Sequence, residues 1–422
     1  MSYRIAGIDV LKRWWPWLWL TSKSKTNINL SDAGTAAILS SCACCRNGIE
    51  QEVEEVVMES TAQYWKPVWG ALERFWKAMC QSRESAGRML GTLHLAQALS
   101  NRGRRGRKTD FRDAERLVKR LVSQELVLSF VPDVEQRLWR TLTRTRYQRT
   151  RDKVRLQNQL EALLEEAPIK LSSLVSDLLG ASARRMLKAL ADGETDPAAL
   201  AALADQRLRA TPAQLHDALG ACTELNPVYR RLVKLTIEGL QFVEQQIRQL
   251  EQEIASLLQW HQDAVERLAV VPGLGVDSAQ QIIAEVGAKA ATFPSAKKLS
   301  SWVGACPGEE ESAGVNRSRH SPKGNRQMRR ILNQAANAAV KRKGSIFEIV
   351  YRRLVPRLGH NKTIGVIAHR LCHLIWIILH NGVRYEERGP AVSKQSQQRH
   401  TARMIRKLRM PGYRVEPIGG PA

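Results

Sequence analysis

The sequence lacks the features of a secreted or membrane-embedded protein. Its most apolar run, residues 364–379, is short for a membrane span and is interrupted by His369, Arg370 and His373, so we expect a buried helix there. No signal peptide precedes the chain, and its 7 cysteines are odd in number and irregularly spaced. We therefore expect reduced thiols and a cytoplasmic protein.

Zinc ligands and acidic residues are also scarce. The cluster formed by Cys42, Cys44 and Cys45 has no second cysteine pair and no nearby histidine, which argues against a zinc site. The chain has 41 acidic residues against 65 Lys and Arg, which gives a formal net charge of +24 and a pI of about 10.2. Because the basic residues recur along the whole length, we expect a polyanionic partner, most simply nucleic acid.

Residues 106–115, GRKTDFRDAE, hold two aspartates three positions apart. If Asp110 opens a helix, Asp113 lies on the same face one turn later. Two such carboxylates can hold a hard divalent cation, although aspartates are also common in a first helical turn as capping residues. The cations before the pair are Arg102, Arg104, Arg105, Arg107 and Lys108. A basic run binds a phosphate backbone, and metal beside phosphate is typical of phosphodiester cleavage.

Residues 1–125 alternate short strands with helices, which indicates an α/β domain. The expected strands are 3–10 and 52–60, and the expected helices are 66–79, 84–99 and 110–124. Asp9 and Glu59 lie near the ends of the two strands. Residues 11–50 show no clear period, and Pro16 argues against a central strand there.

Residues 126–265 are predicted to be a helical, coiled-coil linker region. A long helix is expected over 137–164, with one face formed by Arg137, Arg140, Arg144, Arg151 and Arg155. A heptad pattern runs through Tyr229, Val233, Thr236, Leu240, Val243, Ile247, Leu250, Ile254 and Leu257. We expect this heptad to pair subunits into a dimer or tetramer and the arginines to bind RNA or DNA; the alternative is a helix packed inside its own domain.

Residues 266–388 are predicted to be an all-α domain, followed by a basic, polar tail at 389–422 that is expected to be disordered. Gly273 and Gly275 lie in a turn between helices, the helix–hairpin–helix arrangement in which backbone N–H groups approach a phosphate; a plain αα corner is the alternative. The basic residues of the next loop and helix are Arg317, Lys323, Arg326, Arg329 and Arg330. We assign these residues, with Arg140, Arg144 and Arg151, to nucleic-acid binding.

The order of motifs resembles a known family. GIDV, VVMESTAQYWKPVW, GRKTDFRDAERL, VVPGLG and a downstream Pro-x4-Ser with Lys-Gly-Asn and Arg-Arg follow one another in this sequence. This is similar to the DEDD transposases of bacterial insertion sequences, in the insertion-sequence one-hundred-and-ten family. The resemblance covers about residues 1–10 and 52–388.

The resemblance implies a fold, a site and partners. The first domain would be RuvC-like, a mixed ribonuclease-H-type sheet with helices, in which Asp9, Glu59, Asp110 and Asp113 bind Mg²⁺. Ser312 would be the nucleophile of the last domain. Family members recombine the ends of their element with target DNA under the direction of a bridging RNA, and they assemble as tetramers. A member would associate with the nucleoid when bound to DNA.

The chemistry agrees with this assignment. Phosphoryl transfer needs cations at the scissile phosphate, and four carboxylates can hold two Mg²⁺ ions. A serine hydroxyl needs activation, and a metal–carboxylate site can supply it without a Ser-His-Asp triad. His320 lies eight residues after Ser312, where a role as a triad base and a role as a phosphate contact stay equally open. Ser318 and Ser321 are the rival nucleophiles.

Residues 11–50 depart from the family pattern, since a Trp cluster, Pro16 and three cysteines stand where a second, alternating strand is usual. We hypothesise that two compensating frameshifts scrambled this segment. Two other functions therefore stay open: a decayed transposase that only binds nucleic acid, and a metal nuclease of RuvC type that needs the carboxylates but no serine.

Overall fold

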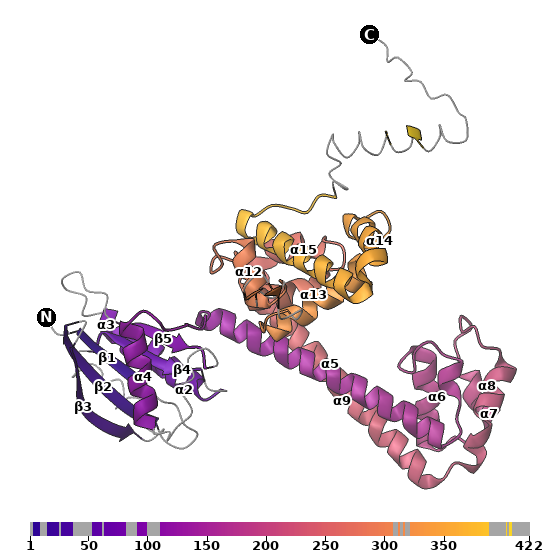
Figure 1. Ribbon diagram of the computed structural model, residues 1–422. Coiled ribbons are helices and arrows are strands. Elements are labelled where there is room, and N and C mark those ends of the chain that lie inside the picture. The colour runs from indigo at the N-terminus through magenta and orange to yellow at the C-terminus, as the bar shows by residue number, and fades with distance from the viewer. Residues whose placement is uncertain are drawn as a thin grey trace. The chain divides into compact units, whose positions relative to one another are not determined.

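The computed structural model describes residues 3–8, 15–24, 27–36, 53–60, 63–81, 91–98, 110–306, 311–312, 315–316, 321–387, 402 and 405–406. The chain divides into two compact units, Met1–Pro132 and Asp133–Ala422 (Figure 1). The four-part division expected from the sequence stays a prediction, and most of the tail at 389–422 lies outside the described residues.

The first unit is built on a five-stranded sheet with the order β3-β2-β1-β4-β5. The strands are β1 Tyr3–Ile8, β2 Trp15–Ser24, β3 Asn27–Ala36, β4 Glu55–Glu59 and β5 Thr92–Ala96. β1, β4 and β5 run parallel, whereas β2 is antiparallel to both β1 and β3. Together with its helices, this sheet is the expected α/β unit.

Two expectations for this sheet are wrong. Residues 11–50 contribute β2 and β3, and Pro16 lies inside β2, paired with Thr35. The pairing with β1 reaches only Trp17, so Pro16 is bordered by one strand and its missing N–H interrupts at most one ladder. Residues 92–96, expected to be helical, form β5, because they pair with β4 and bury Leu95 and Ala96. The frameshift hypothesis stays a hypothesis.

Helices cover both faces of the sheet. A helical segment made of α2 Trp65–Ala71, the π-helix Leu72–Lys77 and α3 Ala78–Gln81 covers one face, and α4 Asp110–Val122 covers the other. The first face buries Ala6, Ile8, Val56, Met58, Leu72 and Trp76, and the second buries Ile5, Val57, Ala96, Ala114, Leu117 and Val118. The two sets alternate along β1 and β4, as the period of two in a strand requires.

Gly7 is the point at which α4 lies closest to β1. A Cβ atom at this position would lie 2.7 Å from the carbonyl oxygen of Ala114 and 2.8 Å from Cγ2 of Val118. Only a glycine lets the helix backbone approach the strand this closely. The glycine of the GIDV motif therefore fixes the distance between α4 and the sheet.

The second unit is organised around two long helices, α5 Val134–Glu166 and α9 Pro227–Leu257, which lie side by side (Figure 1). Arg146 of α5 binds Glu251 of α9 at 2.6 Å, and Lys153 of α5 binds Glu244 of α9 at 2.8 Å. Residue numbers thus rise along α5 as those of the partners in α9 fall, so the two helices are antiparallel. The buried residues of α9 are Val233, Thr236, Leu240, Val243 and Ile254. These are heptad positions, so the heptad face packs against α5 of the same chain. This arrangement is the alternative given above, a helix packed inside its own domain.

Shorter helices gather at the two ends of this pair. One end carries α6 Ala181–Asp192, α7 Pro197–Ala202 and α8 Pro212–Ala218. The other end carries α10 Gln262–Ala269, α11 Val276–Val286, α12 Ala296–Val303, α13 Arg326–Ala339, α14 Ile346–Leu358 and α15 His360–Asn381. Of the described helices, α15 alone is long and apolar enough to cross a membrane, but half of its apolar window is buried inside the fold. The buried helix expected at 364–379 is confirmed.

Replacing Gly7 with alanine should destabilise the first unit by about 1–3 kcal/mol, because the added methyl group overlaps the Ala114 carbonyl. Chemical denaturation followed by tryptophan fluorescence measures this loss. Gly70→Ala is the matched control. A Cβ atom at this position in α2 meets nothing within 4 Å, so the helix should gain up to about 1 kcal/mol. Equal effects of the two substitutions would contradict the close contact.

Candidate active site

The parallel strands and α4 bring candidate carboxylates to one face of the sheet. β1 and β4 pair with Gly7 opposite Val57 and Ile8 opposite Met58. Glu59 ends β4 two residues after Val57, so it points to the face that α4 covers. Asp113 lies in the first turns of α4, directly before Ala114, which touches Gly7. Glu59 and Asp113 are therefore associated with the same face.

The other predicted carboxylates are described less fully. Asp9 follows β1 directly but lies outside the described residues, and Asp110 is described by its backbone alone, as the first residue of α4. Glu59 and Asp113 are half-buried, and Asp113 accepts a hydrogen bond from Arg116. The described side chains contain no group of three His, Cys, Asp or Glu residues that could hold a metal. The four-carboxylate site stays a prediction, and the basic run at 102–108 lies outside the description.

The second unit holds a buried carboxylate that the sequence did not indicate. Glu285, near the end of α11, is 1% exposed. Arg144 of α5 binds it with two parallel hydrogen bonds of 2.8 and 2.9 Å, and the Nδ2 group of Asn325 donates to it at 2.8 Å. Arg140 lies 3.5 Å away. A carboxylate removed from water needs such partners, so Glu285 joins α5, α11 and the start of α13.

Arg140 and Arg144 were expected to bind nucleic acid, but both are used inside the chain. Arg140 donates to the backbone oxygens of Ala284 and Glu285 and lies over the Trp302 ring. Burial lowers the pKa of Arg140 to about 10. These contacts hold α5 on α11. Nucleic-acid binding by the pair, of which Arg144 is 43% exposed at its side chain, stays a prediction. Arg151, on the same helix, is exposed.

The same network closes the base of the loop that contains Ser312. Asn325 caps α13, since its Oδ1 accepts from the N–H groups of Gln327 and Met328. A Cβ atom at Gly324 would lie 2.3 Å from the carbonyl carbon of Val303, so the two ends of the loop are in direct backbone contact. Within the loop, Glu311–Ser312 (β6) pairs with Val315–Asn316 (β7), which places Ser312 opposite Val315.

Ser312 is described by its backbone alone, and Arg317, Ser318 and His320 lie outside the described residues. Ser321 is exposed at the end of the loop. The choice of nucleophile among these serines thus stays a prediction.

The turn at residues 271–274 has the geometry of a type II turn, with Pro272 at its second position and Gly273 at φ +84°. A Cβ atom at Gly273 would lie 2.2 Å from the carbonyl oxygen of Ala335, so this glycine packs against α13. Gly275, at the start of α11, has open space around it. Phosphate contact by Gly273 and Gly275 stays a prediction.

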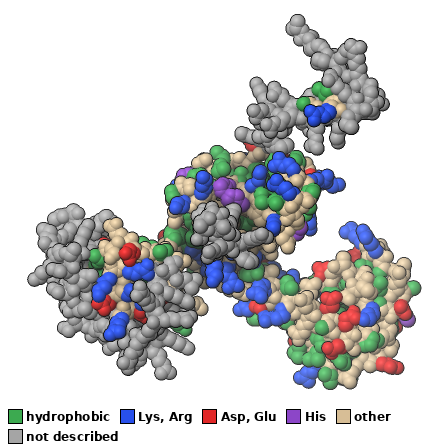
Figure 2. All heavy atoms as spheres, in the orientation of Figure 1, with side chains coloured by type: hydrophobic (Ala, Val, Ile, Leu, Met, Phe, Trp, Pro, Cys, Tyr) green, Lys and Arg blue, Asp and Glu red, His purple; other side chains and the backbone are tan. Residues whose placement is uncertain are grey.

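A cavity of about 900 Å³ lies between α13 and α15, beside both ends of the Ser312 loop. Its polar lining includes Ser321, Arg329, Arg330, Asn333, Asn361 and Lys362. Arg330 is half-buried with its guanidinium 3.7 Å from the centre of the Tyr147 ring, whereas Lys323, Arg326 and Arg329 are exposed. Figure 2 shows Lys and Arg side chains gathered on the body formed by α12–α15, with histidines among them.

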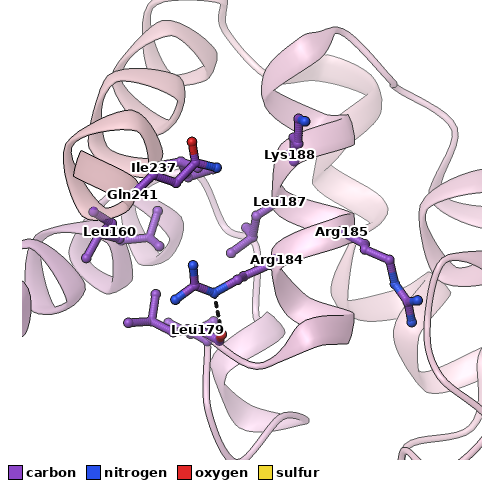
Figure 3. A pocket seen from close by; sticks show the side chains of 10 residues that line it. Leu160, Leu179, Arg184, Arg185, Leu187, Lys188, Ile237 and Gln241 are labelled. Carbon is purple, nitrogen blue, oxygen red and sulfur yellow. Dashed lines mark hydrogen bonds between the residues drawn. The ribbon is translucent and has the colours of Figure 1, made fainter. Parts of the chain in front are cut away.

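A second, smaller pocket of about 150 Å³ lies between α6 and α9 (Figure 3). Its walls are largely aliphatic, with Leu160, Leu187 and Leu240 among them. Arg184 donates to the Leu179 carbonyl and pairs with Glu244. The hydrogen bond from Arg184 to Glu244, more than any other influence, lowers the pKa of Glu244 to about 2. The pocket is a gap beside a structural ion pair and has no cluster of reactive groups.

Sequence reasoning missed Glu285, His369 and His373. Glu285 stands between Ala284 and Val286 of α11, and a glutamate at the end of a buried helix was a signal that could have been noticed. His369 and His373 were noted only as interruptions of an apolar run. Their four-residue spacing places both on one face of α15.

Comparison with known proteins gives the class and the family. Residues 7–168 match the model of the IS110-type DEDD transposases, and residues 265–352 match that of the transposase IS116/IS110/IS902 family. The two parts of the chain thus define a DEDD transposase with a separate C-terminal transposase part. The chain belongs to the IS110 family.

Two relatives illustrate the similarity. The insertion element IS110 uncharacterized 43.6 kDa protein of Streptomyces coelicolor is 29% identical over 154 residues, which are 36% of this chain. The match spans only 38% of that relative's own length. A probable family 20 transposase of Pseudomonas aeruginosa is 24% identical over 280 residues, or 65% of this chain and 73% of the relative.

Glu285→Gln should lower the free energy of unfolding of the second unit by about 3–5 kcal/mol, because two arginines would lose their buried counter-charge. Urea denaturation followed by circular dichroism measures the change. Glu251→Gln serves as the control, since this carboxylate also binds an arginine but is 45% exposed at its side chain. It should cost less than about 1 kcal/mol. A loss no larger than that of the control would show that Glu285 does not hold the helices together.

Proposed function

We propose that the chain is the transposase of an insertion sequence, which cleaves and rejoins DNA strands. The observation that carries this proposal is the common face of the sheet: the α4 contact at Gly7 and the β1–β4 register bring Glu59 and the first turns of α4 together. The strand order with an antiparallel β2 is also the arrangement expected of a RuvC-like, ribonuclease-H-type domain.

Asp9, Glu59, Asp110 and Asp113 are the proposed Mg²⁺ ligands. Asp9 follows Ile8, whose partner Met58 precedes Glu59, so the register supports placing Asp9 beside Glu59. Carboxylate oxygens suit a hard cation. Bound Mg²⁺ would neutralise charge on the scissile phosphate and on the leaving oxygen. The chain's own part is to hold these carboxylates on one face of a rigid sheet.

Ser312 is the proposed nucleophile, in a hairpin whose base is closed by Gly324 and Asn325. Anchoring both ends of the loop to α12, α13 and Glu285 limits the positions that the serine can take, which favours reaction geometry. Attack of its oxygen on a phosphate would form a protein–DNA ester, which conserves the bond energy, and would release a hydroxyl at the end of the cut strand. Attack of a strand hydroxyl on this ester would then join the DNA to a new strand and free the serine. A nuclease of RuvC type would have no use for this serine.

Nucleic acid is the proposed partner, including a bridging guide RNA. The net charge of +24 supports this, as do the exposed side chains of Arg151, Lys323, Arg326 and Arg329. The cavity beside the Ser312 loop, with Arg329 and Lys362 in its wall, would receive the strand. Sequence choice would rest on the RNA, because phosphate contacts carry no sequence information.

A second copy of the chain is the proposed partner of α9. The heptad face is covered by α5, but Val228, Leu232, Leu235 and Phe242 are exposed and recur at intervals of four, three and seven residues. Such a stripe on the outside of a helix is suited to another helix. We propose that it joins subunits into the dimer or tetramer that the carboxylates of one subunit and the serine of another would require.

Ser312→Ala should reduce strand exchange about a thousandfold or more, since no other group supplies the nucleophile. Joined products are counted by sequencing in cells that carry the element with its natural flanking DNA. Ser321→Ala is the control and should keep wild-type activity. Loss of activity in the Ser321 variant, or a trapped DNA adduct mapped to Ser318, would move the assignment. Cleavage and exchange by Ser312→Ala at the wild-type rate would favour a serine-independent nuclease.

Leu235→Glu combined with Phe242→Glu should shift the chain to smaller oligomers without unfolding it, because two charges would be placed in the proposed contact. Light scattering coupled to size exclusion measures the mass, and circular dichroism monitors the fold. Val154→Glu, at a similarly exposed apolar position on α5, is the control. An unchanged mass for the α9 variant would remove α9 as the subunit contact.

A further inference from the structure

A third cavity, of about 480 Å³, shares Cys306 and His369 with the cavity of the proposed active site. Lys297, Ser300 and Ser301 of α12 line one wall, and His369 and His373 of α15 line another. Among the described residues that line it there is no aspartate or glutamate, and Lys297 carries their one formal charge. Such a lining repels cations and attracts an anion.

His369 is held in a fixed orientation, and the His373 ring packs beside it. The Nδ1 atom of His369 lies 2.7 Å from the carbonyl oxygen of Ala305. Because a carbonyl only accepts, this nitrogen carries the proton and donates. The His373 ring lies 4.4 Å from the His369 ring, with an angle of 51° between the planes. Burial lowers the pKa of His373, with smaller contributions from His369 and Lys297, which favours the neutral form of its ring.

His373 also has a buried Nε2 atom without a hydrogen-bond partner in the described part of the chain. A buried polar atom of this kind is a feature that native structures usually satisfy. Its ring and that of His369, tilted by 51° to each other, form a polar wall of aromatic rings, the kind of group on which proteins stack unpaired bases. A charged lysine, an exposed serine hydroxyl and two imidazole rings thus face one space.

The size of the space restricts the ligand. A volume of about 480 Å³ is within the range of pockets that hold a small molecule or a single nucleotide. A base-paired duplex is too wide to enter, and only an unpaired or extruded nucleotide can fill such a pocket. Cys306 and His369 line both this cavity and that of the proposed active site, so the two cavities adjoin.

We propose that this cavity binds one unpaired nucleotide of a nucleic-acid strand, with its phosphate at Lys297 and Ser301 and its base against His369 and His373. The proposal rests on the proposed function, because it adds a position to the path of a strand at the Ser312 loop. It would hold the strand next to the reacting phosphate in a single-stranded form.

The test compares Lys297→Ala with Lys298→Ala in the full-length chain. Both lysines are exposed neighbours on α12, and each substitution removes one positive charge, but only Lys297 lines the cavity. Binding of a fluorescein-labelled single-stranded 20-nucleotide DNA and of its duplex is measured by anisotropy. Lys297→Ala should weaken single-strand binding about tenfold relative to Lys298→Ala, the usual effect of losing a charge-assisted hydrogen bond, and should change duplex binding less than about twofold.

Photocrosslinking supplies a second measurement. Benzoylphenylalanine in place of exposed Ser301 should crosslink to the single strand, and the same group in place of Lys298 should not. Equal affinities of the two lysine variants, or an equal loss for duplex, would overturn the cavity as a nucleotide site while leaving the proposed function intact. A wild-type chain that binds neither probe above the level of albumin would overturn both.

Discussion

The buried charge of Glu285 is the constraint on which the second unit depends. A carboxylate that is 1% exposed is tolerable only because Arg144 and Asn325 donate to it and Arg140 lies close by. Glu285 stands near the end of a buried helix, and its partners come from two other places in the chain: the long helix α5 and the residue that caps α13. The hydrogen bond between Asn325 and the buried Glu285 carboxylate therefore fixes the base of the loop that carries Ser312.

The first unit depends on a steric constraint instead. Gly7 has no side chain, so α4 lies directly on β1, and the alternation of β4 sends Glu59 to the same side. Asp113 is carried there by the helix. Both carboxylates are associated with this face because of backbone packing and strand alternation, and not because of any interaction between them. In the proposed Mg²⁺ site this packing would hold like charges close together, which is the condition in which a divalent cation is bound strongly.

Prediction from sequence succeeded where a local pattern has one physical explanation. The long helix expected at 137–164 lies within α5, Val134–Glu166, because its arginines recur on one face at a 3.6-residue period. It failed where a distant partner decides the outcome. β5 forms because β4 lies beside it. Arg140 is largely buried because it donates to Ala284 and Glu285, which lie over one hundred positions away in the chain. Propensity and spacing carry no information about such partners.

The sequence by itself determined the family, the acidic and serine motifs, the basic charge and most helices, because each is written in a short run of residues. Tertiary structure alone decided which groups are available to a ligand. It showed that the heptad face of α9 is filled by α5, that Arg144 is committed to Glu285, and that His369 and His373 line a cavity with Lys297. The reason is that availability depends on what each side chain touches after folding, and residues far apart in the chain settle that.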